Sequence, residues 1–84
     1  MKVVAYTFDL MPVGGALTLS EVAFNRVRWN LMEFQPATGV RLMSDPPRIR
    51  VRAQGRVAAV APGLLARIEE LAGTSLEVVL VRNW

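Results

Sequence analysis

Apolar and polar side chains alternate strictly along residues 48–53, where every second residue is an arginine. Side chains of a strand point alternately to its two faces, so this spacing predicts a strand. One face carries Arg48, Arg50 and Arg52 as a basic row. The other face is apolar and is expected to pack into a core. This strand with two unlike faces is the most informative local pattern in the chain.

Three other stretches are typical of strands, namely residues 2–10, 40–43 and 76–81. The first is rich in Val, Tyr, Thr and Phe, which favour strands, and it is followed by Pro12 and Gly14. Because this stretch is apolar on both faces, we expect it to lie in the middle of a sheet. The last stretch places three apolar residues on one face: Leu76, Val78 and Leu80.

Residues 19–34 carry apolar side chains at helical spacing, which predicts a helix. The side chains expected to face the core are Leu19, Ala23, Val27, Leu31 and Phe34. Thr18 and Glu21 fit a capping box with Thr18 as the N-cap. Residues 26–31 also alternate between polar and apolar, so a strand over residues 26–34 stays open as the alternative.

A second helix is expected from Pro62, which suits a first helical turn, to Gly73, which is a typical stop. Its apolar stripe consists of Leu64, Leu65, Ile68 and Leu71. Residues 44–47 have the composition of a turn, and Asp45 before a proline suits such a position. Residues 56–61 either extend the sheet or lead into the second helix.

These elements follow the order β-α-β-β-α-β over a single domain of residues 1–84. That is the order of the ferredoxin-like sandwich, in which an antiparallel four-stranded sheet carries both helices on one face. We therefore expect an α+β fold of this class.

Composition narrows the possible chemistry. The 84 residues are 52% apolar with a net charge of +3 and no cysteine or histidine, and the pI is about 10.6. Disulfides, thiolate zinc sites and histidine general bases are thereby excluded, and we expect no cofactor and no metal. The apolar runs are too short for a membrane span, and Asp9 interrupts the first run too early for a signal peptide. We expect a soluble cytoplasmic protein.

Basic residues concentrate in the centre of the chain, and all of them are arginine: Arg41, Arg48, Arg50, Arg52 and Arg56. The planar guanidinium group binds phosphates and stacks on bases. A helix-free sheet face can bind RNA when aromatic side chains stack the bases, and Tyr6 and Phe8 are candidates for this role. The glycine-aromatic signature of an RNA-recognition motif is absent. The alternative is a solvated sheet face whose charges oppose aggregation.

The first helix carries a second candidate surface. Val22, Trp29 and Met32 lie on a different side of the helix from the expected core residues, and Arg26 and Glu33 are close by. Exposed Trp, Met and Arg are enriched where proteins bind one another. Packing on two sides within the domain is the alternative. Trp84 is a similar case and is expected to pack on its own sheet edge or on a neighbouring subunit.

Two features suggest enzymatic chemistry weakly. Asp9, expected at the carboxyl end of the first strand, occupies a position where nucleases hold magnesium against a phosphate. The alternative is a strand-end carboxylate that accepts hydrogen bonds from loop amides. Gly14 and Gly15 lie between a strand and a helix but lack the Lys-Ser/Thr of a phosphate-binding loop. We interpret them as a plain connection.

The sequence thus predicts a small non-catalytic interaction or assembly module that self-associates or binds another protein. The residues expected to contact the partner are Arg48, Arg50, Arg52, Arg56, Trp29, Met32 and Trp84. The alternative is a domain that binds RNA or single-stranded nucleic acid through the arginines. An Asp9-dependent nuclease ranks last.

Overall fold

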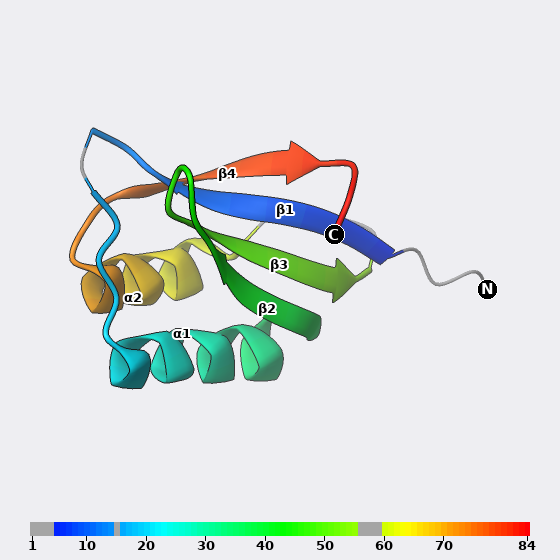
Figure 1. The fold of residues 1–84 in the computed structure, drawn as a ribbon. Helices are drawn as coiled ribbons and strands as arrows, with labels where there is room; N and C mark the ends of the chain where they lie inside the picture. Colours follow the sequence, from blue (N-terminus) through cyan, green and yellow to red (C-terminus); the bar gives the residue numbers. More distant parts are fainter. Residues whose placement is uncertain (1–4, 15, 56–59) are drawn as a thin grey trace.

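The computed structural model describes residues 5–14, 16–55 and 60–84. Figure 1 shows strands and helices in the order predicted from the sequence. The elements are β1 (Ala5–Pro12), α1 (Glu21–Phe34), β2 (Ala37–Met43), β3 (Arg48–Gln54), α2 (Pro62–Ala72) and β4 (Leu76–Val81). The prediction of an α+β fold is confirmed.

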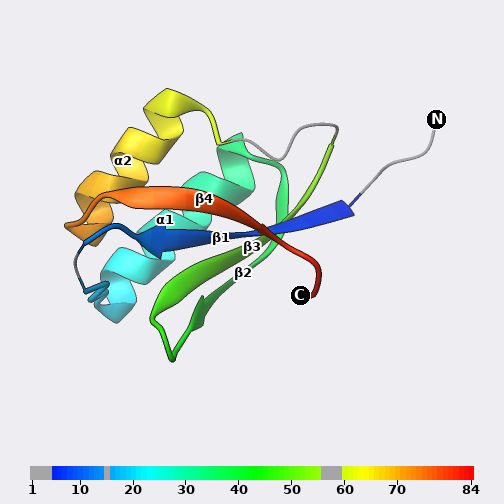
Figure 2. The same cartoon turned by 90° about the horizontal axis from the view of Figure 1, so that it is seen from above.

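The four strands form one sheet in the order β2-β3-β1-β4, and all neighbouring pairs are antiparallel. β1 and β3 are therefore the central strands, and the central position predicted for the first strand is confirmed. Both helices lie on the same side of the sheet, as two perpendicular views show (Figure 1, Figure 2). None of the described residues forms a helix on the opposite side of the sheet.

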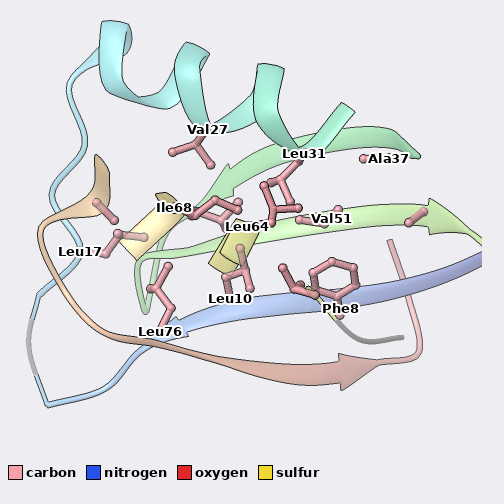
Figure 3. Close-up of a cluster of buried hydrophobic side chains, with 14 residues drawn as sticks. Phe8, Leu10, Leu17, Val27, Leu31, Ala37, Val51, Leu64, Ile68 and Leu76 are labelled. Atoms are coloured by element: carbon pink, nitrogen blue, oxygen red, sulfur yellow. The ribbon is translucent and has the colours of Figure 1, made fainter. Parts of the chain in front are cut away.

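The core lies between the sheet and the two helices (Figure 3). Alternation along β3 places Ile49, Val51 and Ala53 in this core, and each is fully buried. Phe8 and Leu10 of β1 pair with Val51 and Ile49 and are equally buried. The apolar face predicted for residues 48–53 is therefore confirmed, and the arginines must point to the helix-free side.

The helix α1 begins two residues later than the sequence pattern indicated. Its N-cap is Ser20, whose hydroxyl accepts a hydrogen bond from the Ala23 amide at 3.1 Å, so the assignment of Thr18 as N-cap is wrong. Ser20 has the extended backbone that an N-cap requires, and this hydroxyl satisfies one of the free amides of the first turn. The strand alternative over residues 26–34 is also wrong, because all of these residues lie in α1.

Val27 and Leu31 form the buried stripe of α1, but Phe34 is 57% exposed and does not join the core as expected. Phe34 is the last residue of α1, and it lines a surface hollow together with residues at the start of α2. Helical spacing predicts which side of a helix faces the core, but not how far along the helix the core extends. This explains why Phe34, at the end of α1, is exposed although its spacing predicts burial.

The helix α2 agrees closely with its prediction. Pro62 occupies the first turn, and Gly73 follows the helix with a left-handed backbone (φ 71°) that glycine adopts without strain. Leu64 and Ile68 are buried. Residues 56–59, for which the sequence allows either an extension of the sheet or a lead into the second helix, lie outside the described residues. Among the described residues, neither helix is long and apolar enough to cross a membrane.

Candidate functional site

The helix-free side of the sheet carries four arginines and is called the arginine face below: Arg41 of β2 and Arg48, Arg50 and Arg52 of β3. Paired residues of neighbouring strands point to the same side of a sheet. Arg41 pairs with Arg50, and Arg50 pairs with Asp9 of β1, so a carboxylate lies among the guanidinium groups. The predicted basic row is confirmed, but the carboxylate of Asp9 lies beside it on the same face.

Asp9 joins two of these arginines. Arg50 donates from Nε to Oδ1 at 2.8 Å and from Nη2 to Oδ2 at 2.9 Å, and Arg48 donates from Nε to Oδ2 at 2.9 Å. Only 3% of the surface of Asp9 is exposed. Arg48 also donates to the carbonyl of Pro46 at 2.8 Å, which connects the cluster to the turn before β3. The three side chains form one ionic cluster with little freedom to rearrange.

The cluster shifts the pKa of Asp9 and of Arg50. Burial by itself raises the pKa of Asp9, but the hydrogen bonds from Arg50 and Arg48 outweigh it and hold the pKa below its usual value. The same contact with Asp9 raises the pKa of Arg50. Asp9 is therefore an anion whose charge two arginines neutralise at neutral pH.

This arrangement corrects both sequence-based interpretations of Asp9. The residue lies within β1, not at its carboxyl end, and its partners are arginines, not loop amides. Both carboxylate oxygens accept hydrogen bonds from guanidinium groups, which repel a metal cation. Within residues 5–14, 16–55 and 60–84 there is also no group of three acidic side chains placed to hold a metal ion.

The aromatic side chain of the arginine face is Trp84, which comes from the segment after β4. The guanidinium carbon of Arg41 lies 4.2 Å from the centre of its ring, and Arg50 reaches its carbonyl oxygen at 3.5 Å. The ring lies so close to Gly39 that a Cβ there would be 2.9 Å from two ring atoms. Trp84 therefore packs on the sheet of its own chain, one of the two positions expected for it.

Tyr6 and Phe8, the aromatic residues proposed for the arginine face, lie on the opposite side of the sheet, which faces the helices. Phe8 is fully buried in the core (Figure 3), and the Tyr6 hydroxyl accepts a hydrogen bond from Gln35 at 3.2 Å. Strand alternation already places Phe8 on the side of Leu10 and opposite Asp9, so the error was detectable from the sequence. The contact of Trp84 with Arg41 and Gly39 joins distant segments, and no local pattern indicates it.

A hollow of about 480 Å³ remains beside Trp84. Its lining includes Thr7, Arg52, Val81 and Arg82. Arg52 and Arg82 are exposed, and neither makes an ion pair with a described residue. The guanidinium groups of Arg52 and Arg82 are therefore available for an anion in this hollow, whereas Arg48 and Arg50 already bind Asp9. Arg56 and Gly15, both named from the sequence, lie outside the described residues.

The second surface is the outward side of α1, called the Trp29 face below: Val22, Trp29 and Met32, with Arg26 and Glu33 beside them. Trp29 is 69% exposed, Val22 64% and Met32 42%, so these side chains do not pack on two sides within the domain. A hollow of about 370 Å³ next to Trp29 is lined by Asn25, Arg28 and Met32. The expectation that Trp29 and Met32 are exposed is confirmed.

Comparison of the chain with models of protein families, with curated proteins and with solved structures found no match.

Proposed function

We propose that the protein is a small non-catalytic interaction module with a ferredoxin-like fold that binds a protein partner through the Trp29 face. The observation that carries the proposal is the 69% exposure of Trp29 on the outward side of a helix whose inward residues Val27 and Leu31 are fully buried. The strand order and the two helices on one side of the sheet support the ferredoxin-like assignment.

Burial of the Trp29 face by a partner stabilises the complex. Covering apolar surface stabilises by about 25 cal/mol per Å², and a tryptophan offers more such surface than any other side chain. Arg26 and Glu33 border the apolar residues, as polar groups do at the rim of an interface. A helix presenting an apolar stripe on each side is typical of one that packs on two neighbours. Within the domain α1 packs on β2 and α2, and neither covers Trp29 on the outward side.

The test is Trp29→Glu, examined by size-exclusion chromatography with light scattering and by pull-down with the purified protein as bait. We expect loss of self-association or of protein capture, with an unchanged circular dichroism spectrum. Leu80→Glu is the matched control, because Leu80 is 65% exposed but lies on the edge strand β4. A strict monomer whose captured proteins do not depend on Trp29 would disprove the proposal.

A second function is supported by the hollow beside Trp84. We propose as the alternative that Arg52 and Arg82 bind phosphates of single-stranded nucleic acid, with Trp84 close to the bases. The two unpaired guanidinium groups beside an aromatic ring support it. Arg48 and Arg50 contribute less, because both already donate hydrogen bonds to Asp9.

Binding of a labelled RNA oligonucleotide over a series of salt concentrations tests this alternative, since phosphate contacts weaken steeply with salt. Arg52→Glu is the informative variant and Arg28→Glu on α1 is the control with the same charge change. Arg50→Glu is unsuitable for this test, because the new carboxylate would lie next to that of Asp9 on the arginine face and the two would repel each other. Equal binding by the wild type and Arg52→Glu at low salt would overturn the alternative.

A further inference from the structure

We infer that the partner on the Trp29 face is a second copy of this chain, bound with its α1 antiparallel and with the two-fold axis beside Trp29. The inference rests on the proposed function and specifies its partner. Three features of α1 support a second copy: the spacing of two charged residues, their lack of an ion pair with any described residue, and the hollow beside Trp29.

Arg26 and Glu33 lie on the same flank of α1 and are seven residues apart. At about 1.5 Å per residue this separates them by about 10.5 Å along the helix axis. Trp29 is three residues from one and four from the other, so it lies almost at their midpoint. Both charged residues are exposed, and neither makes an ion pair with a described residue.

A two-fold axis through this midpoint makes the helix complementary to itself. In an antiparallel pair of helices, residues of the same flank face each other across the interface. With the axis next to Trp29, Arg26 of each copy lies opposite Glu33 of the other, which gives two ion pairs. A parallel pairing would instead place this flank against the opposite flank of the second copy, where Asn25 and Arg28 lie, so Arg26 and Glu33 would form no ion pair with each other. The charges therefore select the antiparallel arrangement.

The hollow beside Trp29 gives the second copy a place for its own indole ring. Asn25, Arg28 and Met32 line this hollow on the flank away from Arg26 and Glu33. Near the axis, the Trp29 side chains of the two copies lie next to each other, and each ring can enter the hollow of the other copy. An aromatic ring in a pocket at the centre, surrounded by ion pairs, is a favourable interface design.

A single pair of helices buries a small area, so we expect a weak dimer whose population depends on concentration. The closing experiment is charge reversal, measured by sedimentation equilibrium of the full chain. Arg26→Glu and Glu33→Arg each turn two attractions into two repulsions and are expected to weaken dimerisation about tenfold. The double variant exchanges the charges and is expected to restore it. Glu70→Arg makes the same charge change as Glu33→Arg elsewhere on the surface and should have no effect.

Three outcomes overturn the inference in distinguishable ways. A dimer that Trp29→Glu disrupts but charge reversal does not would refute the two-fold axis and leave the proposed function standing. A monomer that captures another protein through Trp29 would refute the second copy as partner only. A dimer insensitive to Trp29→Glu, for example one formed by an edge strand, would refute both.

Discussion

Asp9 and Arg50 lie opposite each other in the two central strands, and Arg50 contacts both carboxylate oxygens, at 2.8 and 2.9 Å. This bidentate pair changes the meaning of the alternating arginines in β3. A row of three arginines on a sheet suggests a surface for binding anions. Two of the three already bind the anion of their own chain, and only Arg52 is left exposed without such a partner.

The ionic cluster predicts a loss of stability in acid. Since the pKa of Asp9 is lower in the folded protein than in the unfolded chain, folding favours its ionised form. This contribution is complete above the unfolded pKa of about 3.9 and is lost as the pH falls from there through the lower folded pKa. Urea unfolding at pH 7 and at steps below pH 4 measures the effect. In Asp9→Asn the decline over this interval should be shallower, and an identical decline would contradict the prediction.

Replacement of arginine by lysine should distinguish neighbouring positions of β3. Lysine cannot contact both oxygens of Asp9 as the guanidinium group does, so Arg50→Lys is expected to lower the free energy of unfolding by about 1–2 kcal/mol. Arg52→Lys is the matched control, because its side chain is exposed, and its effect should stay within about 0.5 kcal/mol. Chemical denaturation of both variants provides the comparison, and equal effects would show that the cluster does not stabilise the fold.

Gly39 controls the position of Trp84. A methyl group at residue 39 would lie 2.9 Å from two atoms of the ring, so Gly39→Ala should push the ring away from β2. Stability should change by less than about 1 kcal/mol, because the end of a side chain can move without the backbone. In a Trp29→Phe background Trp84 is the single tryptophan, and its fluorescence is expected to shift to the red. Gly63→Ala, which meets open space, should leave the emission unchanged.

The same substitution on the two sides of α1 should have very different effects. Val27 is fully buried, so Val27→Ala is expected to destabilise by about 2 kcal/mol through lost contacts and a cavity. Val22 is 64% exposed, so Val22→Ala should change stability by no more than about 0.5 kcal/mol. Thermal unfolding at low protein concentration checks this, since self-association would otherwise stabilise the native state. Similar losses at the two sites would mean that the outward side of α1 is packed.

Local patterns were sufficient to predict the elements and their order. Strand alternation placed Ile49 and Val51 in the core, and helical spacing placed Val27 and Leu31 there, because each pattern is a property of neighbouring residues. Details that depend on competing local groups were less secure. Thr18 and Ser20 both suit an N-cap, and the structure uses Ser20.

The partners of the functional side chains were decided by the tertiary structure alone. Arg50 and Asp9 are 41 residues apart in the chain, and Trp84 reaches Arg41 and Gly39 from the far end of the sequence. Their contacts follow from the strand order, which brings β1 and β3 together and lets the segment after β4 return over β2. Charge and side-chain type are properties of the sequence, but neutralisation and exposure depend on which distant strands become neighbours. The sequence by itself therefore determined that an arginine row exists, and the fold decided which arginine of that row remains available.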